Sequence, residues 1–261
     1  GYGFTVYHTY FQTLNISSQI NLASDDAREK QNGDVEDDKN EHKITKSGDD
    51  MINAFRFNNI TLPSNALVNS AYITFTAKGD KNNTVAEVLI QGQDNTADAP
   101  TFLDCGGGCS DITVRDKTFN SVTWVIPPIV KDLTYDTPDL SAIIQEIIDD
   151  QSGISNAGVA FITEGQGPDY EERAFYSFDG DPTKAPILNI NYTVPGDQPF
   201  NYVITIEETD LPVDAMMSTD NLETSSLYFD GVSDCENNFG YYLPGCKTIY
   251  TNGFLKYNAA R

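Results

Sequence analysis

The sequence predicts an all-β protein: an antiparallel, jelly-roll-like β-sandwich with one short amphipathic helix and a strand-rich C-terminal extension. Three observations support this fold class. Short segments of alternating apolar and polar residues recur with turn signals about every ten residues. Only the segment 138–152 has clear helical periodicity. A Pro- and Gly-containing stretch, 195–199, separates the strongly patterned part from the last 62 or so residues.

The strand predictions begin at the N-terminus, where the apolar residues of segment 1–22 fall on even positions, as in one or two strands. These residues are Phe4, Val6, Tyr10, Leu14, Ile16, Ile20 and Leu22. The next segment, 24–50, is polar and acidic, and its composition predicts a long loop or flap. Alternation then predicts strands at 54–57, 60–62, 68–77, 85–91, 112–115, 121–126, 158–163, 174–178 and 187–194.

The helix is predicted to follow Thr137 as N-cap, with Pro138 at its first position and Gly153 at its end. Its apolar residues recur at a spacing of three and four, which gives one buried stripe. They are Leu140, Ile143, Ile144, Ile147 and Ile148. The only tryptophan, Trp124, is predicted to lie in the core.

The patterning divides the chain into three parts. Residues 1–15 form an N-terminal strand that is a candidate donor for a neighbouring subunit's sheet, 16–195 form the sandwich, and 196–261 form a small disulfide-containing extension. Strands are expected in the extension near 202–207, 226–230 and 248–257. About sixty residues with one disulfide make a marginal core, so we expect the extension to dock on the main domain or on another subunit.

Charge and composition limit the partners. The 261 residues carry a net charge of −23, and 39% are hydrophobic. A nucleic-acid partner is excluded because phosphate binding needs clustered Lys and Arg. No run of 18 apolar residues is present, so membrane insertion is not expected. The acidity indicates either a solubility device or a chain adapted to divalent cations or high salt.

The chain begins at Gly1 without an initiator Met, which predicts a mature product that is secreted to the extracellular space or cell surface. The four cysteines form two local pairs, Cys105 with Cys109 and Cys235 with Cys246. Three connectivities are possible, and proximity favours the two local disulfides and an oxidising compartment. Sequons occur at Asn15, Asn59, Asn82 and Asn191, a number close to the roughly three expected by chance.

Calcium is the cofactor that the carboxylates favour, although none is required. Asp25 and Asp26 precede the acidic loop, and Asp179 and Asp181 lie in a tight acidic turn. Hard oxygen donors of this kind bind Ca²⁺ when loops bring them together. No D-x-D-x-D-G loop is present, so solvated carboxylates without an ion are the favoured interpretation, and a bound Ca²⁺ is the alternative.

Catalytic chemistry finds little support, and we predict that the protein is not an enzyme. The two histidines, His8 and His42, lie in no G-x-S-x-G or H-E-x-x-H context. A glycosidase would need two facing carboxylates, for which Glu164, Glu171 and Glu172 are the candidates. Aromatic platforms for sugars are offered by Tyr170, Tyr176, Tyr241 and Tyr242, although core or interface packing is the favoured explanation for each.

Several stretches between Ile20 and Val194 carry a family resemblance. They are Asp25-Asp26-Ala27, FRFNNITLPSNALVNSAYITFTA, VLIQGQ, SVTWVIPP, TPDLSAIIQEIID and APILNINY. The chain here resembles secreted β-sandwich modules of the disaggregatase-related or DNRLRE type and some carbohydrate-binding modules. The resemblance covers about two thirds of the chain and implies a fold more than a function. Relatives often have Gly-Trp after the helix, whereas this chain has Ser152-Gly153-Ile154, so a ligand role of that Trp has no counterpart here.

Two functions are consistent with this sequence. The first is a structural or adhesive subunit of a surface assembly or filament, joined to copies of itself or to other surface proteins by β-strand addition through the terminal extensions. The alternative is a carbohydrate-binding module with a polysaccharide ligand. A hydrolase is a third hypothesis, which requires two close carboxylates in a cleft.

Overall fold

A computed structural model describes residues 2–7, 10–44, 52–81, 86–94, 96–105, 107–166, 172–196, 202–206, 226–229 and 253–257. The chain divides into two compact units. The sandwich unit comprises residues 13–194, and the terminal unit comprises residues 1–12 together with 195–261.

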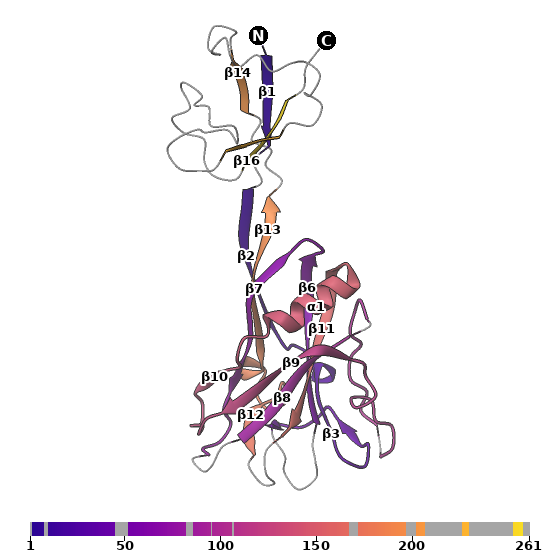
Figure 1. The fold of residues 1–261 in the computed structure, drawn as a ribbon. Helices are drawn as coiled ribbons and strands as arrows, with labels where there is room; N and C mark the ends of the chain where they lie inside the picture. The colour runs from indigo at the N-terminus through magenta and orange to yellow at the C-terminus, as the bar shows by residue number, and fades with distance from the viewer. Residues whose placement is uncertain are drawn as a thin grey trace. The chain divides into compact units, whose positions relative to one another are not determined.

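The sandwich unit is built from two antiparallel sheets and one helix, α1 (Figure 1). The first sheet has the order β10-β7-β13-β2 and the second has the order β4-β3-β6-β11-β8-β9, while β5 and β12 pair separately. The bounds of the elements are β2 (Tyr10–Gln19), η1 (Ala23–Asp25), β3 (Asp26–Glu29), β4 (Val35–Glu36), β5 (Glu41–Ile44), β6 (Ile52–Pro63), β7 (Leu67–Thr76), β8 (Ala86–Gln93), β9 (Lys117–Ile126), β10 (Thr134–Asp136), α1 (Ser141–Gln151), β11 (Gly153–Gly165), β12 (Arg173–Tyr176), η2 (Pro182–Lys184) and β13 (Ile187–Gly196).

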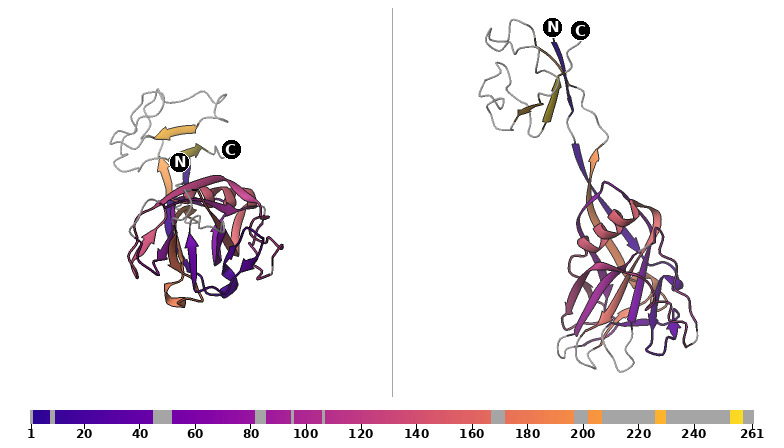
Figure 2. Two further views of the ribbon diagram at one scale, coloured as in Figure 1. Left: turned by 90° about the horizontal axis from the view of Figure 1, so that it is seen from below. Right: turned by 45° about the vertical axis from the view of Figure 1, so that its right-hand side comes forward.

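Figure 2 shows the strands of the sandwich unit from two further directions, and one apolar core joins its two sheets. The ring of Phe75 in the first sheet lies 5.0 Å from that of Phe55 and 5.6 Å from that of Trp124, both in the second sheet. Trp124 is 4% exposed, which confirms its predicted place in the core. The isoleucines of α1 are buried in the same core, against β7 and β9. The predicted all-β, antiparallel sandwich-like fold with one helix is therefore confirmed.

The middle of the second sheet, around β6 and β11, is buried on both faces, which strict alternation does not predict. Segment 96–116 crosses its outer face and packs Phe102 and Ile112 against small residues of the sheet, Ala27, Ala54 and Ala160. Small side chains are needed there because the covering segment lies close to the strands. As a result, five consecutive residues of β6, 53–57, are buried.

The acidic segment 24–50 was predicted to be a loop or flap, and the prediction is wrong for its described part. Residues 23–44 form η1, β3, β4 and β5. Glu36 binds Arg28 and Lys30 at 2.8 Å each and Lys39 at 3.2 Å, while Val35 is fully buried. Composition misled here because the charges neutralise one another locally instead of being solvated separately. Residues 45–50 lie outside the described residues.

Glu36 should make stability depend on pH. Burial opposes ionisation of Glu36, but Lys30, Arg28 and Lys39 outweigh it and lower its pKa from 4.5 to about 2. Because the folded pKa lies below the unfolded one, the stability it contributes is present above pH 4.5 and is lost as the pH falls towards 2. We expect Glu36→Gln to lower the free energy of unfolding at pH 7 by roughly 1–3 kcal/mol.

Urea unfolding at pH 7 and near pH 2 measures this effect. The difference between wild type and Glu36→Gln should shrink at the lower pH. Glu87→Gln is the matched control, since no ion pair of the described residues involves Glu87. A difference that is equal at both pH values would show that Glu36 acts through packing instead of charge.

The helix begins later than predicted, at Ser141, with Leu140 at the N-cap position. Thr137 is not the cap because its hydroxyl accepts a hydrogen bond from the backbone N–H of Ile73 at 3.1 Å. Asp139 likewise accepts from the backbone N–H of Ala71 at 2.9 Å. These bonds hold 137–139 against the edge of β7, so the helix starts only after them. Its end at Ser152, followed by Gly153 with a φ of +103°, matches the predicted end.

The segment 112–115 was predicted to be a strand but forms a turn. The backbone N–H groups of Ile112 and Thr113 donate to the Glu29 carboxylate at 2.7 and 2.9 Å, which replaces the pairing of a strand. The other strand predictions in the sandwich unit correspond to observed strands, and β11 and β9 extend beyond their predicted bounds.

The terminal unit contains a sheet with the order β14-β1-β16-β15. Its strands are β1 (Tyr2–Tyr7), β14 (Tyr202–Ile206), β15 (Ser226–Phe229) and β16 (Gly253–Tyr257). The N-terminal β1 is a central strand, antiparallel to β14 on one side and to β16 on the other. β13 continues to Gly196, through the start of the predicted linker, and residues 197–200 lie outside the described residues.

Candidate functional site

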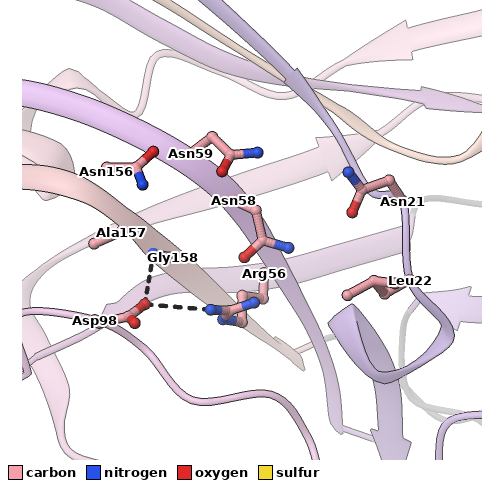
Figure 3. A pocket seen from close by; sticks show the side chains of 9 residues that line it. All are labelled: Asn21, Leu22, Arg56, Asn58, Asn59, Asp98, Asn156, Ala157 and Gly158. Atoms are coloured by element: carbon pink, nitrogen blue, oxygen red, sulfur yellow. Dashed lines mark hydrogen bonds and ion pairs between the residues drawn. The ribbon is translucent and has the colours of Figure 1, made fainter.

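A polar groove opens on the sandwich unit where β6 and β11 become irregular (Figure 3). Its volume is about 420 Å³. Asparagines dominate the lining, together with one ion pair and one exposed apolar side chain. The lining residues are Asn21, Leu22, Arg56, Asn58, Asn59, Asp98, Asn156, Ala157 and Gly158.

Irregular backbone shapes the groove. The register of β11 against β6 shifts on both sides of Ala157, which marks β-bulges. Asn59 of β6 and Asn156 of β11 have φ values of +59° and +50°. Asparagine tolerates this left-handed conformation better than other residues with a Cβ. The backbone N–H of Asn156 donates to the Thr61 hydroxyl at 3.0 Å, which fixes the bulge.

Arg56 forms the floor of the groove and is only 9% exposed. Its Nη1 lies 2.7 Å from Oδ1 of Asp25, its Nη2 lies 3.2 Å from Oδ1 of Asp98, and its Nε donates to the carbonyl oxygen of Ala99. Asp98 also accepts from the backbone N–H of Gly158 at 2.7 Å. A Cβ on Gly158 would lie 2.6 Å from Cζ of Arg56, so glycine is needed at this position.

Asp25 lies fully buried beneath the groove. Burial raises the pKa of its carboxyl above the usual value, and the guanidinium of Arg56 and the amide of Asn58 offset this only in part. Asn58 donates to Oδ2 of Asp25, so both carboxylate oxygens have partners. Asp25 and Arg56 are therefore bound to each other in the floor, and neither is available as a separate ligand.

The four predicted metal ligands are not gathered into one site. Asp25 is bound by Arg56, and Asp181 caps η2 by accepting from the backbone N–H of Thr183 at 3.0 Å. Burial raises the pKa of Asp179. The charge of Asp26 lies near enough to raise this pKa further. Calcium binding by this set stays a prediction.

Asp26 is bound within the protein at one of its two oxygens. Its buried side chain places Oδ2 3.1 Å from Nε2 of His42, and the same oxygen accepts from the backbone N–H of Phe178 at 2.8 Å. Oδ1 of Asp26 has no hydrogen-bond partner among the described residues. His42 is thus buried beside Asp26, although its Nε2 makes no hydrogen bond among the described residues.

A second carboxylate group was missed by the sequence analysis. Oxygens of Asp94, Glu146 and Asp150 lie within 4.8 Å of one another. Spacing alone would have placed Glu146 and Asp150 together, four residues apart on α1. Glu146 accepts from the backbone N–H groups of Phe119 and Asn120 at 2.5 and 2.8 Å, so it caps the edge of β9.

A disulfide joins Cys105 to Cys109, as predicted. Cys235 and Cys246 lie outside the described residues. Of the sequons, Asn15 and Asn59 are exposed, while Asn191 is half-buried and donates to Oδ1 of Asn15 at 2.8 Å. Asn82 lies outside the described residues.

The remaining candidate residues do not form a common site in the described part of the chain. Glu164 is exposed, and Glu172 binds Lys43 at 3.3 Å and Lys81 at 3.6 Å. The ring of Tyr176 lies 4.6 Å from Nζ of Lys184, which is a packing role. The other candidates, His8, Glu171, Tyr170, Tyr241 and Tyr242, lie outside the described residues.

The fold and the groove thus define an all-β sandwich protein with a polar surface site. No protein-family model matches the chain, and no curated protein matches it. No helix within the described ranges is both long and apolar enough to cross a membrane.

Solved structures of two plant viruses share a distant likeness. One, from Desmodium yellow mottle tymovirus, is 6% identical, with 77% of this chain and 92% of that chain covered and a TM-score of 0.28. Two from turnip yellow mosaic virus, one titled as an empty head, are 11% identical, with 77% of this chain and 86% of each covered and TM-scores of 0.28 and 0.27. At such TM-scores the likeness carries no argument about function.

Proposed function

We propose that this protein is a structural subunit of an extracellular assembly and that its copies associate by β-strand addition. The observation behind the proposal is β2, a ten-residue strand that ends the first sheet. On the side away from β13, no strand of the described chain pairs with it. An unpaired edge presents N–H and C=O groups to any strand that approaches it.

The other three edges of the two sheets are poorer templates. β10 has three residues and β4 has two. β9 has ten residues, but it begins with the charged Lys117, and Glu146 already accepts from two of its backbone N–H groups. Natural sheets protect their edges by short strands, by charges or by covering groups, and these three edges show such devices.

β2 lacks those devices. Its sequence, YFQTLNISSQ, contains no charged residue, no Pro and no Gly. This is notable in a chain of net charge −23, because two copies repel each other over most of their surfaces. Pairing of β2 with β2 of a second copy would bring no like charges together. Such a contact between identical strands is antiparallel and two-fold.

The N-terminal donor strand needs a correction. The predicted donor, residues 1–15, includes β1, and β1 already has β14 and β16 of its own chain on its two sides. It could reach a neighbour only by leaving both partners. The free edge of the N-terminal segment belongs to β2, so we assign strand addition to β2.

Sedimentation analysis of two matched variants tests this proposal. Asn15 lies exposed on the edge strand β2, and Asn69 lies exposed on β7; both bond to Asn191 at 2.8 Å. We expect Asn15→Lys to raise the dissociation constant of self-association about tenfold or more, because two added charges meet at the edge. Asn69→Lys, two strands from the edge, should leave it unchanged.

Ionic strength gives a second readout. Added salt screens the repulsion between acidic copies, so wild-type association should strengthen from low to physiological salt. The proposal is wrong if the wild type stays monomeric at the highest soluble concentration. It is also wrong if Asn15→Lys and Asn69→Lys weaken association equally.

A further inference from the structure

We propose that the polar groove of Figure 3 binds a neutral, polyhydroxylated ligand, a saccharide unit. The inference is independent of self-association. It begins with hydrogen-bonding capacity that the protein does not use itself. The side-chain amides of Asn21, Asn59 and Asn156 make no hydrogen bond within the described part of the chain. Each amide offers two N–H donors and one carbonyl acceptor.

Asparagines on another face of the sandwich unit do use their side-chain amides, so the unused amides are a feature of the groove. On the outer face of the first sheet, Asn69 donates to Asn191, Asn191 donates to Asn15, and Asn189 accepts from Ser17. Those amides satisfy one another across the strands. The three groove amides come from separate segments, the stretch after β2, β6 and β11, and line the same groove.

Charge decides the class of ligand. Arg56 is paired with both Asp25 and Asp98, so the groove floor carries one positive and two negative charges. An anionic ligand would meet this excess of negative charge and the field of a chain at −23. A metal cation would be repelled by the guanidinium of Arg56, and it would find amides where it needs several free carboxylates. A neutral ligand avoids both penalties.

The remaining lining fits a sugar. Amides donate to and accept from hydroxyl groups, and carboxylates accept from them. Asp98 has a second oxygen beyond the Oδ1 that accepts from Arg56 and Gly158. Leu22 is 50% exposed at the same groove and offers apolar surface to the C–H face of a ring. The volume of about 420 Å³ lies within the range of about 300–1,000 Å³ typical of small-molecule sites, which suits a short saccharide.

The groove is also prepared for binding. Its floor is fixed by three bonds of the buried Arg56, and the bulge that carries Asn156 is fixed by the bond from the backbone N–H of Asn156 to Thr61. A floor and backbone fixed in this way lose little conformational freedom when a ligand binds.

A glycan array tests the ligand class, with neutral glucans, mannans, galactans and xylans beside uronic-acid, sialylated and sulfated glycans. The protein should be produced in a host that adds no N-glycans, because Asn59 begins a sequon at the groove. We expect binding to neutral glycans and none to acidic ones. Absence of neutral binding, or preference for acidic glycans, would overturn the inference.

Calorimetry with the best neutral oligosaccharide then tests the place. Asn156→Gly and Asn59→Gly remove an amide but tolerate the positive φ, and each should weaken binding about fivefold to tenfold. Ser152→Gly is the matched control, because Ser152 has a φ of +58° and does not line the groove. Equal loss in all three variants, or unchanged binding in the first two, would contradict the site. Asn15→Lys should bind as wild type, so this test and that of self-association fail separately.

Discussion

Replacing Arg56 by Met should lower the free energy of unfolding at pH 7 by about 3–5 kcal/mol. Arg56 is the cationic partner of the fully buried Asp25, at 2.7 Å, and it also binds Asp98 and the carbonyl oxygen of Ala99. Methionine keeps most of the volume but leaves the Asp25 charge without its partner. The loss is large because a single buried charge costs more than the pair.

Thermal and urea unfolding measure the effect, and two comparisons identify its cause. In the double variant Arg56→Met/Asp25→Asn the charge is gone, so part of the loss should be recovered. The pKa of Asp25 is already raised by burial, and removal of Arg56 raises it further. When folding raises the pKa of a carboxyl group, the free energy of unfolding falls as the pH rises through that pKa. The difference in free energy of unfolding between wild type and Arg56→Met should therefore be smaller near pH 4 than at pH 7. A deficit that is the same at both pH values, without recovery in the double variant, would show that Arg56 acts by packing alone.

Phe75→Ala should lower the free energy of unfolding by about 3–5 kcal/mol. Phe75 is fully buried in the first sheet, and its ring lies 5.0 Å from that of Phe55, 5.3 Å from that of Phe175 and 5.6 Å from that of Trp124. Removing it takes away transfer free energy and leaves a cavity between the two sheets, which rigid strands cannot close.

The matched control is Phe119→Ala, since Phe119 is 93% exposed at the edge strand β9. Its substitution should change the free energy of unfolding by less than about 0.5 kcal/mol. Both variants are measured by urea unfolding under the same conditions. A loss below about 1 kcal/mol for Phe75→Ala would mean that the aromatic cluster does not hold the sheets together.

The sequence predicted well wherever one face of a segment is buried. Period-two alternation located β7 and β13, and the isoleucine stripe located α1, because each element faces the core on one side only. Prediction from the sequence failed where tertiary contacts override the alternation or the helix-start signal. Segment 53–57 is buried on both sides beneath segment 96–116, and the first helical turn is displaced because Thr137 and Asp139 bond to β7.

The candidate sites show the same division. Local spacing correctly predicted the Cys105–Cys109 disulfide, because the two cysteines lie only four residues apart in the chain. The four aspartates proposed for Ca²⁺ were grouped by composition, yet Asp25 is held by Arg56 and Asp181 by Thr183. The resemblance to secreted β-sandwich modules, the absence of enzymatic activity and the extracellular location stay predictions.

The sequence by itself determined an antiparallel sandwich with one helix, because the positions of apolar residues decide which face of each strand leaves water. Only the tertiary structure decided which strand edge stays open and which polar residues share a groove. Both depend on residues far apart in the chain: β2 pairs with β13, and Asn21, Asn59 and Asn156 line one groove where the register of β11 shifts. A one-residue bulge moves such side chains from one face to the other, and residue patterns do not reveal it.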